Sequence, residues 1–364
     1  MVKLDIVRSA NAALADATKS FVAVVAGGTA GIGEFTVRAI AATFASHGNG
    51  LRVYIVGRNE GAARKIISDC ETVCLGGSFS FYKADLSLIR DVDRVCADIT
   101  RAEQGEAETS HAPAKIDFLV CCQGILSTSH EETPEGLDKY FSLFYYSRMR
   151  FIDRLLPLLT ASPLAGHVVS VLNASVKSAL VLDDMSLREP RNQGLLTAFA
   201  HLVGMTNIFM EEVVRRNAGK ISLSHYYPGN VPTNAASTGN FPWWLKTILT
   251  WVIIPLSRPF GVPFEECGQR VLFMASPMRF PALGIDEAVQ DNTAIAIKRI
   301  DGLEAARGMD GEIGSGAYRV TSDGDAYPQE KRYGELHEKS IADKVYQHTM
   351  TVFAEIEAGR PFRG

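Results

Sequence analysis

The residues with the clearest chemical potential form a glycine-rich turn near the start of the chain. Residues 27–33 read Gly-Gly-Thr-Ala-Gly-Ile-Gly and follow directly after the apolar run 21–26. Glycines at this spacing reach backbone conformations closed to other residues and let a pyrophosphate approach the main chain. A helix that begins at the turn would add free amides and the positive end of its dipole. The turn therefore predicts a dinucleotide site. The expected contacts are Gly27, Thr29, Gly31, Ile32 and Gly33.

A second residue, Arg58, bears on which nicotinamide dinucleotide would bind. It follows the next apolar run, 51–56, and no carboxylate stands at that spot. An acidic residue there would bind the ribose 2′-hydroxyl of NAD, whereas an arginine can hold a 2′-phosphate with two hydrogen bonds. An ordinary surface charge is the alternative interpretation of Arg58. We predict NADP(H) as the cofactor.

The elements that must position these residues follow a regular alternation. Six apolar runs are typical of buried strands, at 21–26, 51–56, 79–83, 116–121, 167–172 and 221–226. Helical patterns separate them at 33–46, 61–74, 88–104, 135–159 and about 195–216, with a polar loop at 105–115. Strands that alternate with crossover helices build a doubly wound, mostly parallel sheet of the Rossmann type. We expect a single α/β domain of this class.

These motifs resemble the short-chain dehydrogenase/reductase (SDR) family over about residues 20 to 275. Residues 26–33 are similar to its TGxxxGIG signature, with Ala26 in place of the threonine, and Arg58 stands where NADP-preferring members have theirs. Three other segments, Tyr145–Arg148, Ser170–Leu172 and Gly316–Tyr318, resemble a branch of fungal specialised metabolism near the retinol-dehydrogenase-like proteins.

The resemblance implies further contacts to the cofactor. Asp85 and Leu86 match the family's contact to the adenine, and Gly124 is what remains of a segment that usually reads Asn-Asn-Ala-Gly. Pro228 and Gly229 match a turn after the sixth strand. Val231 belongs to a segment that resembles the family's contact to the nicotinamide amide.

The catalytic residues that the family uses are missing. The resemblance implies a tetrad of asparagine, serine, tyrosine and lysine, in which the tyrosine exchanges a proton with the reacting oxygen. The asparagine position falls on Phe144 and the serine position on Asn173. There is no tyrosine between Tyr146 and Tyr226, and no lysine between Lys177 and Lys220. The helix at 195–216 therefore lacks both residue types.

Three kinds of replacement can be weighed. His201 lies in the tyrosine window and could donate a proton near neutral pH, although a packed structural histidine is the alternative. Tyr145 and its neighbour Tyr146 stand beside the asparagine position, but aromatic residues on a helix often belong to the core. Asn173 and Ser175 could hydrogen-bond a substrate oxygen or be ordinary loop residues. We expect no metal in this site.

An apolar, aromatic segment, 243–256, lies where this family has its substrate lid, and we place the lid at about 236–262. Its tryptophans suggest a large hydrophobic ligand. A membrane-surface helix or a subunit contact are the alternatives.

We divide the chain into an N-terminal segment 1–20, the sheet domain 21–275 and a C-terminal extension 276–364 packed on the same domain. The extension contains a short strand around 317–320.

Composition narrows the function further. The 364 residues are 46% hydrophobic and 21% charged with a formal net charge of −4, so we expect no nucleic-acid partner. The apolar stretches are too short to span a bilayer, and the start of the chain has no signal-peptide pattern. Both observations favour a cytoplasmic protein. A homodimer is a weaker expectation.

Three hypotheses remain for a protein that binds hydrophobic small molecules. They are an NADPH-dependent reductase with altered acid chemistry, a redox-neutral cyclase, isomerase or dehydratase, and a non-catalytic binding protein.

Overall fold

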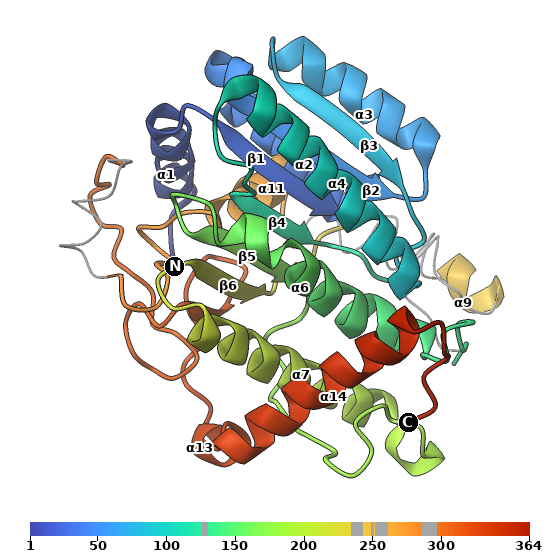
Figure 1. Ribbon diagram of the computed structural model, residues 1–364. Coiled ribbons are helices and arrows are strands. Elements are labelled where there is room, and N and C mark those ends of the chain that lie inside the picture. The colour runs from blue at the N-terminus through green and yellow to red at the C-terminus, as the bar shows by residue number, and fades with distance from the viewer. Residues whose placement is uncertain (126–129, 234–242, 249–250, 252–260, 286–296) are drawn as a thin grey trace.

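The protein is built on one seven-stranded parallel sheet. The computed structural model describes all residues except 126–129, 234–242, 249–250, 252–260 and 286–296 (Figure 1). The strands are β1 (Phe21–Ala26), β2 (Leu51–Gly57), β3 (Ser78–Lys83), β4 (Phe118–Cys121), β5 (Gly166–Val171), β6 (Ile221–Tyr226) and β7 (Ala317–Val320). Their order is β3-β2-β1-β4-β5-β6-β7, and each neighbouring pair is parallel. The order reverses between β1 and β4, which is where doubly wound sheets bind ligands.

Helices cover both faces of the sheet. One face carries α4 (Ile89–Ser110), α6 (Ser147–Leu159) and α7 (Leu195–Arg216), and the other carries α2 (Gly31–Thr43), α3 (Glu60–Val73) and α11 (Phe264–Phe273). Alternation along β1 explains why two cores form. Val22, Val24 and Ala26 belong to the first core, whereas Phe21, Ala23 and Val25 belong to the second. The α/β Rossmann-type prediction is confirmed.

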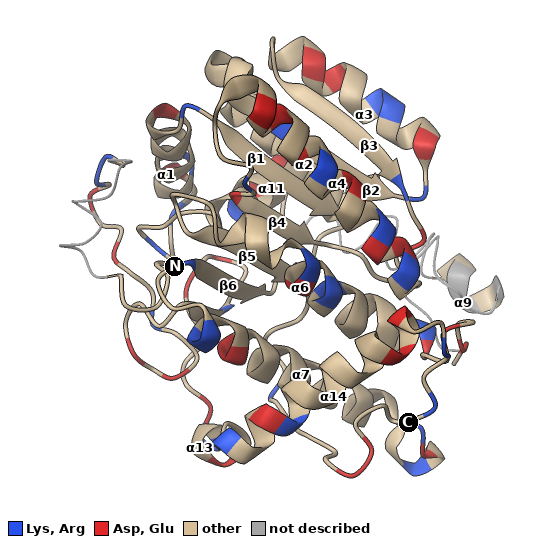
Figure 2. Cartoon of the chain, viewed as in Figure 1, with Lys and Arg blue, Asp and Glu red and all other residues tan. Residues whose placement is uncertain are grey.

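Charge follows this layering. Figure 2 shows acidic and basic side chains interspersed along α3 and α4, while the strands in the middle are almost without them. This is the expected distribution for helices that bury one stripe and expose the other.

Among the described residues of the C-terminal extension, β7 (Ala317–Val320) and α14 (Lys339–Glu357) belong to the same sheet and core. β7 pairs with β6, and α14 (Lys339–Glu357) packs across α7 and reaches α4 (Figure 1). Arg154 and Arg150 of α6 both form ion pairs with Glu357, and the Arg150 guanidinium lies 4.8 Å from the centre of the Phe353 ring. The strand predicted around 317–320 therefore forms, as the edge strand of the sheet.

Two predicted element boundaries were wrong. The loop expected at 105–115 is helical as far as Ser110, because Glu103 is buried and its carboxylate accepts hydrogen bonds from Arg52 at 2.7 Å and from Tyr54 at 2.6 Å. These contacts anchor the polar end of α4 to β2, the strand next to the edge strand β3. The long helix expected at 135–159 starts with the short α5 (Lys139–Phe141) and a π-helical turn, 142–146, before α6. π-Helical turns often occur at functional sites. The chain also begins with a helix, α1 (Leu4–Ala17).

Candidate active site

The glycine turn lies at the carboxyl end of β1, beside the crossover between β1 and β4. Gly27 and Gly31 have positive φ angles of 81° and 55°, in the region that glycine reaches most easily. A Cβ on Gly33 would lie 2.3 Å from the Gly27 carbonyl oxygen, so only glycine fits there. The N-terminus of α2 has no side-chain cap, so its first amides remain available to an anion. This cradle fits the pyrophosphate of a dinucleotide.

Arg58 lies at the next strand end, close to the same turn. It is exposed, and no acidic side chain in the described part of the chain pairs with it. Thr29 packs on the residue before it, since a Cβ on Gly57 would lie 2.8 Å from the Thr29 Oγ1 atom. Asn59, on its other side, caps α3 by accepting a hydrogen bond from the Ala62 amide at 3.0 Å. Arg58 is thus held between a strand end and a capped helix, with its guanidinium directed to solvent.

The other predicted cofactor contacts also lie at the carboxyl edge of the sheet. The Asp85 carboxylate accepts hydrogen bonds from the amide and hydroxyl of Ser87, at 3.0 and 2.8 Å, while Leu86 is buried and offers its main chain. Gly229 has a φ of 76° in the turn after β6. A Cβ on Gly31 would lie 3.2 Å from Thr233, which brings the segment that begins at Val231 next to the start of α2.

The floor of the site, between the ends of β4 and β5, is held by a buried arginine that sequence reasoning missed. Arg148 donates hydrogen bonds to the Gln123 carbonyl at 2.6 Å, the Val171 carbonyl at 2.8 Å and the Ser170 hydroxyl at 2.7 Å. It is 1% exposed, and burial lowers its pKa. The side chain also lies 5.4 Å from the Phe144 ring, which in turn packs on Gly124. The helical spacing of Phe144, Arg148 and Phe151 was the available sign that this cation faces inward.

His201, the first candidate for proton donation, is part of a structural clamp. Its Nδ1 accepts a hydrogen bond from the Val181 amide and its Nε2 donates to the Met185 carbonyl, both at 3.0 Å. Burial lowers its pKa, so the ring is neutral near pH 7 and its one N–H is already used. The clamp holds the loop after β5 against α7. This geometry favours the structural alternative for His201 over proton donation.

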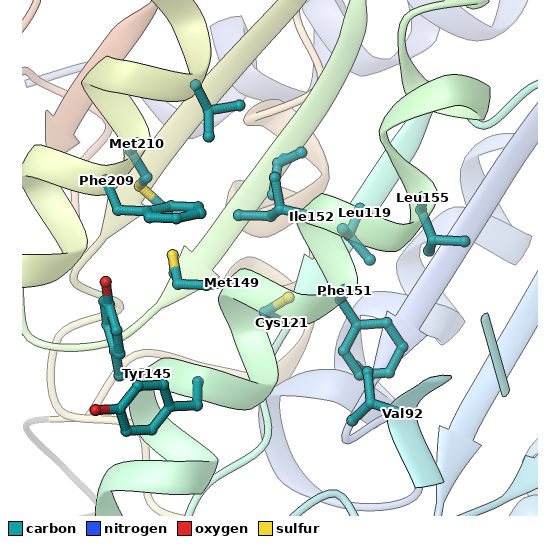
Figure 3. Packing of buried hydrophobic residues seen from close by; sticks show 14 of the residues in the cluster. Val92, Leu119, Cys121, Tyr145, Met149, Phe151, Ile152, Leu155, Phe209 and Met210 are labelled. Atoms are coloured by element: carbon teal, nitrogen blue, oxygen red, sulfur yellow. The ribbon is translucent and has the colours of Figure 1, made fainter. Parts of the chain in front are cut away.

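Tyr145 and Tyr146 also face the interior. The Tyr145 hydroxyl is hydrogen-bonded to Thr349 of α14 at 2.6 Å, and the Tyr146 hydroxyl to His348 at 2.9 Å. Figure 3 shows Tyr145 among buried side chains of α6 and α7, including Met149 and Phe209. Burial raises the pKa of both phenols. The core interpretation of these tyrosines fits the structure better than a catalytic one.

Asn173 and Ser175 are brought together at the carboxyl end of β5. The Ser175 hydroxyl donates to the Asn173 Oδ1 atom at 2.5 Å, and its amide donates to the same oxygen at 3.1 Å. The loop that carries this pair is held from the C-terminal extension, because the Arg319 guanidinium of β7 donates hydrogen bonds to the Ala174 carbonyl. No local pattern could have found this contact, because Arg319 reaches the loop only through the pairing of β7 with β6.

The lid segment is only partly visible. Residues 234–242, 249–250 and 252–260 lie outside the described residues, and within the remainder α9 (Trp243–Ile248) lies on the side to which the strands point (Figure 1). Trp244 is 52% exposed and Trp251 77% exposed, so these apolar side chains have little cover in the structure. Among the helices that the structure describes, none has the length and apolar character needed to cross a membrane.

With this geometry in place, comparison with known proteins identifies the family. The sequence profile of the short chain dehydrogenases matches residues 21–238, and Oxidoreductase AN1596 of Emericella nidulans is 35% identical over 96% of this chain and 97% of its own length. The chain belongs to the short-chain dehydrogenase family. This is a family of oxidoreductases, and the predicted resemblance is confirmed.

Other relatives fit the predicted branch. The short-chain dehydrogenase/reductase SAT2 of Stachybotrys chartarum is 34% identical over 98% of both chains, and the human polyprenol dehydrogenase is 26% identical over 42% of both. Among solved structures, an uncharacterised protein of Mycobacterium paratuberculosis superposes with a TM-score of 0.54 at 14% identity, covering 92% of this chain and 93% of that one. This last likeness supports the fold alone.

Proposed function

We propose that this protein is an NADP(H)-dependent reductase of a hydrophobic small molecule, working without the family's helical tyrosine and lysine. The observation that carries the proposal is the intact cradle. The positive-φ glycines, the start of α2 without a side-chain cap and the exposed Arg58 together fit a dinucleotide that bears a 2′-phosphate. When bound, such a cofactor supplies a hydride, and the chain's own residues must orient the substrate and provide the proton.

The substrate class follows from the surroundings of the site. Phe144 packs on Gly124, and Trp244 and Trp251 are exposed apolar side chains on the side to which the strands point, the side on which the polar Asn173–Ser175 pair follows β5 (Figure 1). An apolar wall with a few polar groups is typical of pockets that bind hydrophobic molecules with one or two oxygens. The names of the fungal relatives describe oxidoreductases, which agrees with hydride transfer.

Titration calorimetry with NADPH and NADH tests the proposal. We expect wild-type protein to prefer NADPH, and Arg58→Ala to lose at least a factor of ten in NADPH affinity, about 1.4 kcal/mol, with little change for NADH. Arg101→Ala, which removes an exposed arginine from α4, is the matched control and should change neither affinity. Equal affinities for the two cofactors in the wild type would refute the NADP(H) assignment.

A redox-neutral isomerase or cyclase is the second candidate, and one observation favours it. The loop after β5 packs on α7 where the tyrosine and lysine would stand, since the Ala179 amide donates to the Ala200 carbonyl at 3.1 Å and a Cβ on Gly204 would lie 2.7 Å from the Ala179 carbonyl oxygen. Product formed from a hydrophobic substrate without consumption of NADPH, followed by absorbance and product mass, would select this alternative.

A further inference from the structure

The loop after β5 places its side chains alternately inward and outward as it leaves the sheet. Ala174 is fully buried, whereas its neighbours Asn173 and Ser175 are half-buried and exposed, respectively. The Asn173 Oδ1 atom accepts hydrogen bonds from both the amide and the hydroxyl of Ser175. The Nδ2 group of the same side chain is thereby turned the other way and can donate to a ligand oxygen. A contact that fixes the main chain at Ala174 would fix the direction of both polar side chains.

This loop starts beside the cofactor turn. Arg148 donates to the carbonyls of Gln123 and Val171 and so joins the ends of β4 and β5. The Gln123 amide in turn packs on Gly27 of the glycine turn. Asn173 follows Val171 by two residues and therefore lies at the same edge of the sheet. Ligands of doubly wound sheets bind at this edge.

Arg319 of β7 holds the loop at the buried residue between the two polar side chains. Its guanidinium donates to the Ala174 carbonyl from Nε at 3.2 Å and from Nη2 at 2.7 Å, and Nη2 also donates to the Val176 carbonyl at 3.3 Å. The residue is 7% exposed, and burial lowers its pKa. Because an arginine stays charged in a protein even when it is buried, these hydrogen bonds are charge-assisted.

Glu330, also from the C-terminal extension, completes this hold on the loop. Its carboxylate forms an ion pair with Arg319 and accepts hydrogen bonds from the amide and the hydroxyl of Ser178, at 3.2 and 2.9 Å. From the α7 side, Asn207 donates to the same hydroxyl at 3.0 Å. The segment 174–178 is therefore fixed at both ends, mainly by two residues that lie outside the matched family profile.

Two buried arginines thus act on successive parts of one loop. Arg148 binds the Val171 carbonyl before the polar pair, and Arg319 binds the Ala174 carbonyl within it. His225 of β6 is paired in register with Arg319, and its pKa is lowered to about 3, first by burial and then by the two cations. The neutral ring adds no third positive charge beside the loop. Arg148 holds the end of the loop next to the cofactor turn, and Arg319 holds the polar pair.

We propose that Arg319 is a positioning residue of the substrate site, which holds Asn173 and Ser175 in the orientation that binds the oxygen of a hydrophobic carbonyl compound. This inference rests on the proposed function. The Asn173 Nδ2 group donates to the substrate oxygen and Ser175 fixes the direction of that amide. Arg319 touches neither substrate nor cofactor and acts only through the Ala174 carbonyl and Glu330.

Hydrogen exchange, read by mass spectrometry, tests the hold on the loop without any substrate. In Arg319→Lys we expect peptides that cover 172–178 to exchange about tenfold faster, because a lysine cannot reproduce the paired hydrogen bonds of a guanidinium. Peptides of the glycine turn, 27–33, should be unchanged. Glu330→Gln, which keeps the side-chain shape but removes the ion pair, should act in the same direction and serves as a second variant if Arg319→Lys does not fold. Unchanged exchange of 172–178 in the folded variants would refute the inference.

Arg279 provides a matched control in the same part of the chain. Its guanidinium donates to the carbonyls of Glu304 and Gly324 and pairs with Asp325, so the contacts have the same chemistry but do not involve the loop after β5. Arg279→Lys should leave the exchange of 172–178 at the wild-type rate. Equal acceleration of 172–178 in Arg279→Lys and Arg319→Lys would show a general loss of stability and would also refute the inference.

Kinetics with acetophenone and NADPH separate positioning from plain stability. Arg319→Lys should lower kcat/KM by about tenfold while the Kd for NADPH stays constant. In an Asn173→Ala background the same substitution should have no further effect, because Arg319 acts through Asn173. Full and independent losses from the two substitutions would refute the inference while the proposed function stands. If the wild-type protein neither binds NADPH nor reduces the ketone, the proposed function fails and the inference fails with it.

Discussion

Removal of the Arg148 guanidinium should weaken both the fold and cofactor binding. Arg148→Met keeps most of the side-chain volume but leaves the Gln123 carbonyl, the Val171 carbonyl and the Ser170 hydroxyl without their donor. Each buried acceptor left unsatisfied costs about 1–3 kcal/mol. Because the substitution also removes a buried cation that contacts no carboxylate among the described residues, we expect the lower end of this range, about 3 kcal/mol in total.

The effect on the cofactor follows from what Gln123 touches. A Cβ on Gly27 would lie 2.8 Å from the Gln123 amide nitrogen, so the segment that Arg148 holds packs directly on the phosphate-binding turn. A shift of this segment should lower NADP⁺ affinity by about tenfold, or 1.4 kcal/mol. Urea unfolding followed by circular dichroism measures the first effect. Calorimetry, at a temperature where the variant is still folded, measures the second.

Arg150 provides the matched control because it is another buried arginine, two residues along the same helix. Its guanidinium forms ion pairs with Asp93, Asp153 and Glu357, on the side of α4 and α14 and away from the strand ends. Arg150→Met should therefore destabilise the fold without changing NADP⁺ affinity. If the two variants lose stability to a similar extent and bind NADP⁺ equally well, Arg148 is an ordinary core residue and the reasoning is refuted.

Three further predictions concern the turn, the oligomeric state and the response to acid. Gly33→Ala should abolish measurable NADP⁺ binding because its Cβ meets the Gly27 carbonyl oxygen, whereas Gly105→Ala, where a Cβ meets nothing within 4 Å, should bind normally in the same calorimetric assay. Light scattering should show a monomer, since α14 covers α7 and thereby one of the long helices through which members of this family often pair, and a dimer that survives dilution would contradict this. Four histidines, three of them buried and His348 half-buried, have pKa values lowered by burial, to about 4 for two of them and about 3 for a third. They are His167, His348, His225 and His201. These histidines are neutral in the folded protein and become protonated in the unfolded chain. The free energy of unfolding should therefore fall as the pH drops from about 6.5 toward 4, by up to about 1.4 kcal/mol per pH unit for each histidine. A urea midpoint that stays constant across this pH range would refute the argument.

Sequence patterns were sufficient for the sheet because its strands are buried on both faces. The run Phe21–Ala26 is continuously apolar, and Ile221–Tyr226 is apolar or small except for His225. This separates them from the amphipathic helices, and both match the observed strands. The glycine turn was equally accessible, since its residues are consecutive in the chain. The end of α4 was not, because its helicity depends on the buried contacts of Glu103 with a distant strand.

The catalytic candidates were harder to predict because their environment is tertiary. His201 has the right type and position, but the loop after β5 occupies both of its ring nitrogens, and no local pattern indicates this. Tyr145 likewise stands beside the expected asparagine position, yet it contacts α14, whose place against α7 could not be predicted from the residues of either helix. A family pattern locates positions along an element, whereas packing decides which side chains reach the substrate.

The losses and gains at this site have a common origin in the C-terminal extension. Its β7 brings Arg319 to the strand ends, where the guanidinium binds the Ala174 carbonyl and Glu330 binds the Ser178 amide and hydroxyl, so the extension fixes the loop after β5 in place. That loop covers the positions on α7 where a tyrosine and a lysine would act. The same extension places the Arg319 guanidinium against the Ala174 carbonyl, so a fixed cation stands beside the loop that follows the serine position.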